Sequence, residues 1–266
     1  MATIEDVARR AGVSVSTVSY ALSGKRPVAD ETRRRILSII EELDYRPHTL
    51  ASRLASKRSW IIGIHYPTET GSLSEGQLEL VFKITQAATQ KGYSVMLWPR
   101  IMRPEEIWKL VRQNLLDGLV LAEVSRRDAR VDLLKEKGFP FVMMGRCADN
   151  SGLSYVDVDF HSTLRQCVDH LFALGHRHIA FVNASQELIR QEINWVLCAM
   201  EGFRQAAADL GIRGEIFTCK STPRCAYELV QSIIRQPAYP TGLIMLTDNI
   251  APGVLKAIKD AGLRVP

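Results

Sequence analysis

The segment AGVSVSTVSYALSG, residues 11–24, combines short apolar residues with an unusual number of hydroxyl groups. At about 100° per residue, one stripe of a helix would carry most of the hydroxyls and another the apolar side chains. The hydroxyl stripe consists of Ser16, Ser19, Tyr20 and Ser23, and the apolar stripe of Val18, Ala21 and Leu22. The spacing therefore predicts a helix with an apolar back and a small polar front that can approach a polar partner closely.

The composition is that of a globular protein with a sizeable core. The chain has 266 residues, of which 46% are hydrophobic and 24% charged, which excludes disordered and fibrous classes. It starts with the acidic MATIED and has no apolar run near the roughly 20 residues that span a bilayer. Five cysteines without a C-x-x-C pair argue against disulfides and zinc sites. We therefore expect a cytoplasmic protein without a membrane segment.

Positive charge is concentrated in the first quarter of the chain. Residues 1–60 hold 11 Lys and Arg against 7 Asp and Glu, and the remainder is nearly balanced, within a net charge of +5. A basic segment of this kind indicates a polyanionic partner, although a solvated charged face is the commoner alternative.

The pattern of apolar residues differs between the first and the remaining part of the chain. Before residue 46, three short helical patterns predict a compact bundle, with Thr3 and Asp6 as a capping pair, Gly12 in a turn and Ser14 as an N-cap. From Trp60 onward, eight apolar runs alternate with helix-length segments. Such runs predict parallel strands that are buried on both faces and joined by helices, and eight of them favour two sheets over one.

The predicted fold class is an all-α three-helix helix-turn-helix head followed by an α/β domain of two doubly wound parallel-sheet lobes. The expected boundaries are residues 1–46 for the head, 47–59 for a hinge helix or linker, 60–160 for the first lobe and 161–266 for the second.

A helix-turn-helix unit places its second helix in the major groove of DNA while other groups fix the phosphates. Any small three-helix bundle is the alternative, and the local positive charge favours DNA. Free amide groups at a helix start attract anions, so Ser14 and Thr17 suit phosphate contact. The full set of expected phosphate contacts is Thr3, Ser14, Thr17, Ser19, Ser23 and Arg26.

Residues 3–47, TIEDVARRAGVSVSTVSYALSGKRPVADETRRRILSIIEELDYRP, resemble the DNA-binding domain of the lactose-repressor (LacI/GalR) family of bacterial regulators. The runs SWIIGIHYP, DGLVLAE, LGHRHIAFVN, AMEGFRQA and KAIKDAGLRVP follow in the family's order. The resemblance implies a homodimer that binds a near-palindromic double-stranded DNA operator. It also implies that a small-molecule effector, such as a sugar, changes operator affinity by entering the cleft of a periplasmic-binding-protein-like domain.

By the same resemblance, Val15, Ser16 and Tyr20 would read bases. The helical stripe agrees for Ser16 and Tyr20 and puts Val15 at the edge of the apolar side, where it would be part of the core or touch a thymine methyl group. Tyr20 departs from the arginine that is common in the family. Since arginine favours guanine through two hydrogen bonds and tyrosine offers one hydroxyl, we expect an altered operator preference.

No nucleophile elbow, phosphate loop or dinucleotide fingerprint occurs, so the sequence predicts neither an enzyme, a catalytic residue nor a cofactor. A metal site could be built from four residues that lie close together in the sequence, Asp169, His170, His176 and His178. Gly175 ends the predicted helix between them and His178 begins a strand, which favours surface and capping roles over a metal site.

Ligands of open parallel sheets bind beyond the carboxyl ends of the strands. The polar or aromatic residues expected there are Trp98, Arg100, Glu123, Arg146, Asn183, Lys220, Ser221, Asp248 and Asn249. Asp248 and Arg146 match cleft positions of the family, and Trp98 and Ser221 complete the predicted effector contacts. Capping or surface roles are the alternative for each.

The family pattern also fails at several places. Ala199 replaces a usual arginine, Ser221 replaces a frequent aromatic residue, and TETGSLSEG, residues 68–76, replaces an Asp…Asn-Pro-Phe stretch. Because the chain stops at GLRVP, we expect an incomplete second lobe, as in a fragment or a truncated product. Two further hypotheses stay open: a DNA-binding regulator without effector sensing, and a cytoplasmic small-molecule-binding protein or enzyme, which leaves residues 1–58 unexplained.

The segment RPHTLASRLASKRS, residues 46–59, resembles the family's hinge, in which Leu54 would wedge into the minor groove. A linker helix packed on the larger domain is the alternative. We expect Leu54→Ala to weaken operator binding, measured by fluorescence anisotropy, because the leucine would unstack a central base step. Dimerisation and effector binding should persist, and loss of all three properties would instead mean structural damage.

Overall fold

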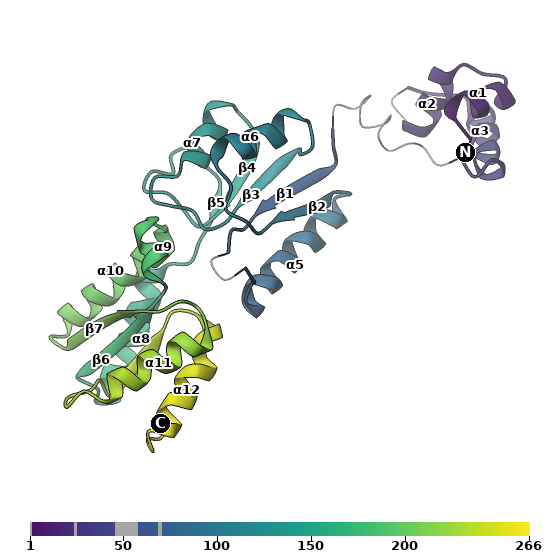
Figure 1. Ribbon diagram of the computed structural model, residues 1–266. Coiled ribbons are helices and arrows are strands. Elements are labelled where there is room, and N and C mark those ends of the chain that lie inside the picture. Colours follow the sequence, from purple (N-terminus) through teal and green to yellow (C-terminus); the bar gives the residue numbers. More distant parts are fainter. Residues whose placement is uncertain (1, 24–25, 46–57, 69–70) are drawn as a thin grey trace. The chain divides into compact units, whose positions relative to one another are not determined.

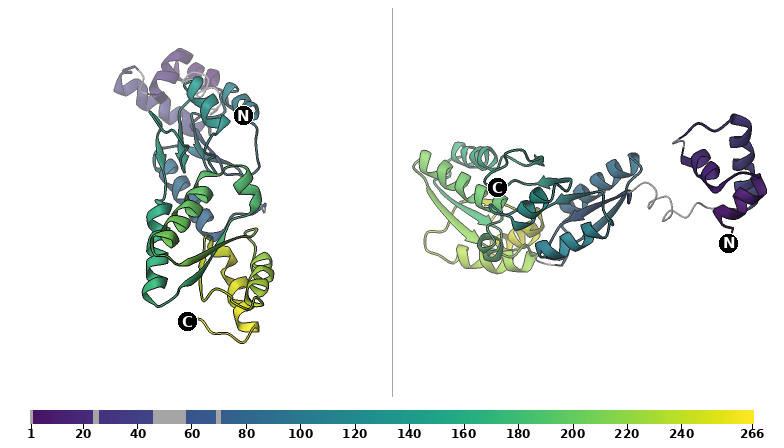
Figure 2. Two further views of the ribbon diagram at one scale, coloured as in Figure 1. Left: turned by 90° about the vertical axis from the view of Figure 1, so that its left-hand side faces the viewer. Right: turned by 90° about the horizontal axis from the view of Figure 1, so that it is seen from above.

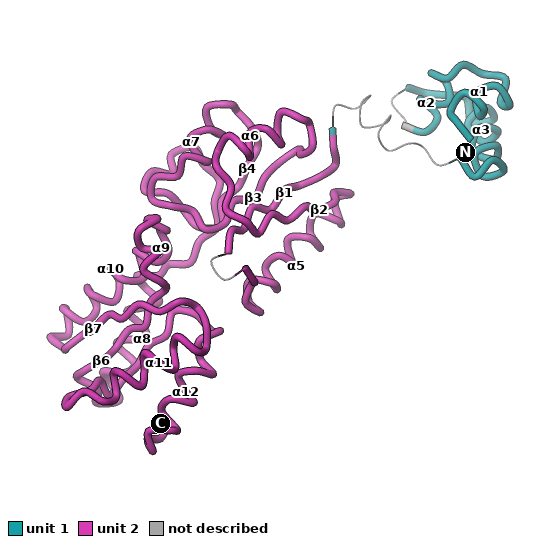
Figure 3. The backbone as a smooth tube through the Cα atoms, viewed as in Figure 1, with its two compact units in different colours: residues 1–58 teal, residues 59–266 magenta. Residues whose placement is uncertain are grey.

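The computed structural model describes residues 2–23, 26–45, 58–68 and 71–266, and the chain divides into two compact units, residues 1–58 and 59–266 (Figure 3). No helix within these described ranges is long and apolar enough to cross a membrane. Leu54, in the predicted hinge, lies outside the described residues, as do Gly24 and Lys25.

The first unit contains a three-helix head. Its helices are α1 (Ile4–Ala11), α2 (Val15–Ser23) and α3 (Asp30–Glu42) (Figure 1). Their shared core consists of Val7, Ala8, Ala11, Val18, Ala21, Ile36, Ile39 and Tyr45. Thr3 and Asp6 form the expected capping box, and Gly12 ends α1 in the left-handed conformation at φ 63°. The turn between α1 and α2 therefore rests on a residue that adopts this conformation without steric cost.

The first lobe of the second unit is a parallel sheet of five strands in the order β2-β1-β3-β4-β5. The strands are β1 (Ile61–His65), β2 (Ser94–Trp98), β3 (Gly118–Leu121), β4 (Phe141–Met144) and β5 (Tyr155–Val156). The helices are α5 (Glu75–Gln90), α6 (Pro104–Arg112) and α7 (Ala129–Glu136). Helix α5 covers one face of the sheet, and α6 and α7 cover the other (Figure 1).

The second lobe has three parallel strands in the order β7-β6-β8. The strands are β6 (His178–Asn183), β7 (Arg213–Thr218) and β8 (Gly242–Met245). The helices are α8 (Phe160–Ala173), α9 (Gln186–Arg190), α10 (Asn194–Asp209), α11 (Pro223–Ile234) and α12 (Ala251–Asp260), with a short 3₁₀ turn, η1 (Asp248–Ile250). Helices α8 and α10 pack together on one face, and α11 and α12 on the other (Figure 2).

The prediction that all strands are buried on both faces is wrong at the sheet edges. Strand β5 has two residues, and Val156 in it is 73% exposed. Strands β2 and β7 also carry exposed positions, whereas the central β3 and β6 are buried. An edge strand has a neighbour on one side only, so an apolar run there need not be covered.

A buried polar network supports the first lobe beneath the strand ends. Arg130 makes two hydrogen bonds with Asp128, at 2.9 and 2.6 Å, and donates from Nη1 to His65 Nδ1 at 2.9 Å. Since a guanidinium only donates, Nδ1 of His65 accepts, and Nε2 carries the proton that is donated to the Arg100 carbonyl at 3.0 Å. Burial, followed by the Arg130 charge, lowers the pKa of His65 to about 4. The network therefore holds one cation, one anion and a neutral histidine.

We expect Arg130→Met to lower the free energy of unfolding by about 3 to 5 kcal/mol, because the Asp128 carboxylate would stay buried without its partner. Urea unfolding followed by circular dichroism measures this change. The matched control is Arg103→Met, whose guanidinium is 81% exposed and 3.8 Å from Glu106, where the loss should stay below about 1 kcal/mol. Equal losses in the two variants would contradict this role of the network.

Candidate nucleic-acid interface and ligand cleft

Helix α2 presents its hydroxyl-bearing side to solvent. Val18 and Ala21 are buried in the head, while Ser14 and Ser16 are exposed and Tyr20 is half-buried. Val15 is 40% exposed and therefore does not belong to the core of the head. The exposed start of α2 thus carries two of the three predicted base-reading residues, and Tyr20 lies one turn further along.

The hydroxyl groups at the start of α2 hydrogen-bond to one another. Ser14 Oγ accepts the Thr17 backbone N–H at 3.1 Å, which makes Ser14 the expected N-cap. The same oxygen lies 2.7 Å from Ser16 Oγ and 2.9 Å from Thr17 Oγ1. Because a hydroxyl can rotate between donor and acceptor roles, this cluster can reorient toward a phosphate or a base edge.

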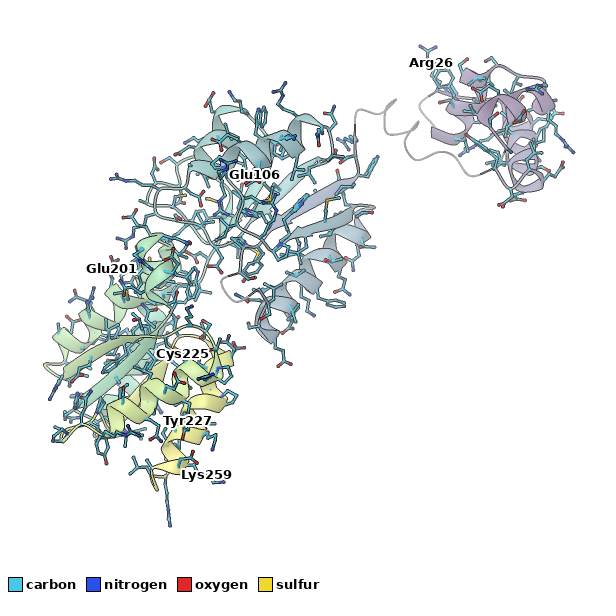
Figure 4. All side chains as sticks on the ribbon, viewed as in Figure 1. Arg26, Glu106, Glu201, Cys225, Tyr227 and Lys259 are labelled. Carbon is cyan, nitrogen blue, oxygen red and sulfur yellow. The ribbon has the colours of Figure 1, made fainter. Side chains whose placement is uncertain are left out.

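Tyr20 and Arg26 lie next to each other at the other end of this face. The guanidinium carbon of Arg26 is 5.3 Å from the centre of the Tyr20 ring, and Figure 4 shows Arg26 at the edge of the head. This is cation–π distance, so the arginine supplies a positive charge beside the predicted base-reading tyrosine.

The remaining predicted phosphate contacts differ in how available they are. Thr3 Oγ1 is engaged in the cap of α1, donating to Asp6 Oδ2 at 2.9 Å. Ser19 lies on α2 and is half-buried, and the side chain of Ser23 lies outside the described set. The structure also exposes Arg33, Arg34 and Arg35 on α3, which the site prediction did not name although the run of three arginines is visible in the sequence.

A cavity of about 720 Å³ lies between the two lobes of the second unit. Asp248 and Ser221 line it, as predicted for effector contacts. Asp248 Oδ1 accepts the backbone N–H of Asn249 at 2.8 Å, and Asn249 Nδ2 donates to the Ser221 carbonyl at 2.6 Å. On the opposite wall lies Gly76, where an added Cβ would be 3.6 Å from Asp248 Oδ2.

The other two predicted effector residues do not line the cavity. Arg146 pairs with Asp157, a lining residue, at 3.1 Å. Trp98 packs against the apolar core of the first lobe, where its ring fills the space above Gly63. The structure therefore places Trp98 in a packing role, because the end of β2 turns this side chain toward the core that α6 and α7 cover.

The cavity has lining residues that the effector prediction omitted. Trp195, at the start of α10, donates its indole N–H to Glu123 Oε2 at 2.8 Å and thereby joins the two lobes. Glu123 has a left-handed backbone at φ 50°. Burial raises the pKa of the Glu123 carboxyl, and it also raises the pKa of Tyr66, where the Glu123 charge adds to the effect. The sequence pattern places Glu123 at the end of a strand. It gives no signal for Trp195, because the two residues are 72 positions apart in the sequence.

A second set of contacts joins the lobes on the side of α9 and α10. Arg126 donates to Glu201 at 2.6 Å and to Asn194 Oδ1 at 3.1 Å, and Figure 4 labels Glu201 on α10. Backbone hydrogen bonds from Asn194 to Val124 and from Arg126 to Glu192 reinforce this junction.

Within the described residues, one group has donors close enough for a metal ion: His161, Cys198 and Glu201, whose ligand atoms lie within 4.8 Å of one another. The Glu201 carboxylate of this group already accepts a hydrogen bond from the Arg126 guanidinium. The sequence pattern disfavours a metal site at Asp169, His170, His176 and His178. In the structure, His178 pairs with Glu215 at 2.7 Å, His176 bonds to Thr241 and Asp169 pairs with Arg165. These side chains therefore have separate partners.

Two family models match the chain. Residues 3–48 match the model of bacterial regulatory proteins of the lacI family, and residues 168–266 match the model of a periplasmic-binding-protein-like domain. Together with the head and the two lobes, these matches define the class of helix-turn-helix DNA-binding transcription regulators with a periplasmic-binding-protein-like part.

The predicted resemblance to the LacI family is therefore supported by the head and by the relatives that match along the whole chain. It is 29% identical to catabolite control protein A of Priestia megaterium, over 99% of this chain and 79% of that protein. It is also 29% identical to the transcriptional repressor PurR of Actinobacillus pleuropneumoniae serotype 5b, over 100% of this chain and 79% of that protein. The structure of the lac repressor dimer bound to operator and an anti-inducer matches with a TM-score of 0.83 and 24% identity, over 99% and 79% of the two chains. The predicted family and fold class are thus confirmed.

Proposed function

We propose that this protein is a transcriptional repressor that binds a near-palindromic operator as a homodimer and changes its affinity when a small molecule enters the cavity between the lobes. The observation that carries the proposal is helix α2, which buries Val18 and Ala21, leaves Ser16 exposed and leaves Ser19 and Tyr20 partly exposed. That geometry suits a helix in the major groove. We place this activity in the cytoplasm, where bacterial DNA is found.

In this proposal each part of the first unit has one task. Val15, Ser16 and Tyr20 read base edges, and Leu54 wedges into the minor groove from a hinge at residues 47–59. Phosphates are held from the head, residues 1–46, by Thr3, Ser14, Thr17, Ser19, Ser23 and Arg26. The lobes at residues 60–160 and 161–266 carry the effector cleft, with Asp248 and Ser221 in its wall and Arg146 paired with the lining residue Asp157.

An exposed apolar face on α5 supports the homodimer. Leu78 and Phe82, one helical turn apart, are 54% and 63% exposed, although α5 packs Val81 and Ile84 on the sheet. Large apolar side chains gathered on one helix favour a protein partner, and a second copy of this chain fits the two-fold symmetry of a palindromic site.

A regulator without effector sensing is the second candidate. Ala199, which stands where the family usually has an arginine, is fully buried in the core that α8 and α10 form, so it offers nothing to a ligand. Thermal stabilisation by a ligand separates the two candidates, because only a binding protein is stabilised by mass action. A small-molecule-binding protein or enzyme is disfavoured, since it has no use for the head, and the relatives are transcription regulators.

The proposal is tested by selecting duplexes from a random pool with the full chain. We expect an enriched sequence of two symmetric half-sites, and an affinity that falls steeply with salt because bound Lys and Arg release counterions. Enrichment of no sequence over random DNA would overturn the proposal.

Tyr20→Arg is the sharpest variant for the same selection. We expect its consensus to change at one position of each half-site, with guanine favoured, because arginine can make two hydrogen bonds to guanine. An unchanged consensus would show that residue 20 does not read bases.

The homodimer is tested with Phe82→Glu, which places a charge on the exposed face of α5. We expect the dimer to dissociate at least about tenfold more readily in analytical ultracentrifugation, because a buried unpaired charge costs several kcal/mol. Leu174→Glu is the matched control, since Leu174 is 64% exposed at the end of α8. The same dissociation for both variants would remove α5 as the interface.

A further inference from the structure

The cavity between the lobes carries acidic side chains in its wall. Its described lining residues include Glu123, Asp157 and Asp248, and none of them is Lys or Arg. Arg146 pairs with Asp157 at 3.1 Å, and Arg130, near the backbone of Glu123, pairs with Asp128 at 2.6 Å. No ion pair joins Glu123 or Asp248 to another residue of the described ranges. The negative charges of Glu123 and Asp248 therefore have no ion-pair partner in the described part of the protein, and the Arg130 charge that acts on Glu123 is itself paired with Asp128.

One of these charges, Glu123, lies among aromatic rings. Trp195 donates its indole N–H to Glu123 Oε2 at 2.8 Å, and the ring of Trp195 is 5.9 Å from that of Phe160. Tyr66 lines the same cavity and lies close enough for the Glu123 charge to add to the effect of burial in raising the Tyr66 pKa. In the described part of the chain, the indole N–H is the side-chain donor that reaches this carboxylate, which can also accept through Oε1.

We propose that the cavity binds a small organic cation whose ammonium group lies against the Glu123 carboxylate and the rings of Trp195, Phe160 and Tyr66. A carboxylate flanked by aromatic rings attracts such a group through its charge and through cation–π interaction. This inference rests on the proposed function and deepens it by naming the chemical class of the effector.

The charges of the wall discriminate among classes of ligand. An anionic ligand, such as a phosphate ester, would meet Glu123 and Asp248 without a lining cation to offset them. A neutral sugar could donate hydroxyl hydrogen bonds to the same carboxylates but would leave their charge uncompensated. Burial raises the pKa of Glu123 because its charged form has lost solvation, and a bound cation supplies the interaction that water no longer provides.

Three pairs of probes test the proposal, each pair matching a cation with a neutral analogue of similar shape. The pairs are choline with 3,3-dimethylbutan-1-ol, 2-phenylethylamine with 2-phenylethanol, and glucosamine with glucose. The readout is the indole N–H resonance of Trp195 in nuclear magnetic resonance titrations of the full chain. A Trp195→Phe variant assigns this resonance among the four tryptophans.

We expect the cation of at least one pair to bind at least about tenfold more tightly than its neutral partner. Glu123→Gln should abolish that preference while keeping an acceptor for the Trp195 indole. The matched control is Glu136→Gln, which removes the same charge at the exposed end of α7 and should leave the preference unchanged. Thermal unfolding of both variants confirms that they are folded.

The proposal is overturned if no cation binds, if the neutral partner binds as tightly in every pair, or if Glu123→Gln folds and keeps the preference. Operator binding by the same preparations separates this failure from that of the proposed function. Loss of the cation preference with a selected operator still bound removes only the effector class. A cation preference in a protein that selects no operator supports the site and removes the repressor function.

Discussion

Burial of Val18 and Ala21 in the head is the constraint on which the proposed DNA-binding face depends. These two side chains pack among α1, α2 and α3, and their burial fixes the rotation of α2 about its own axis. Once that rotation is fixed, Ser16 and Tyr20, two residues before and after Val18, lie on the opposite side of the helix, where Ser16 is exposed and Tyr20 half-buried. Ser14 caps the same helix from its start, so the residue that ends the turn also belongs to the polar cluster. Fold and binding face therefore arise from one amphipathic pattern.

In the second unit, residues that follow the strands of two separate sheets line one cavity. Parallel strands end on the same side of each sheet, so the loops after β1, β3, β4 and β8 meet at the cavity wall. The buried Arg130 network fixes the loop after β3 from below, and the Glu123–Trp195 hydrogen bond links that loop to α10. Packing of the first lobe is thus directly connected to the residues that a ligand would touch.

Local patterns in the sequence were sufficient to predict the helices and strands but not the residues that line the cavity. The head, its caps at Thr3 and Ser14, and the alternation of strands and helices follow from spacing over a few residues. Trp98 could not be placed this way, because only the packing of the whole lobe decides whether a strand-end side chain turns to the core or to the cleft. Trp195 reaches Glu123 across 72 residues, and no local signal marks such a pair. Exposure of β5 likewise depends on its place at the sheet edge.

Gly76 lies opposite Asp248, on the other lobe, with 3.6 Å between the position of a Cβ and the carboxylate oxygen. A Cβ at this distance would make an ordinary van der Waals contact, so the free space at position 76 ends at about the first carbon of a side chain. A bulky residue at position 76 would extend beyond this contact and hold the two lobes further apart. In the proposed effector-responsive repressor, residue 76 would therefore tune how far occupancy of the cleft is converted into closure of the lobes.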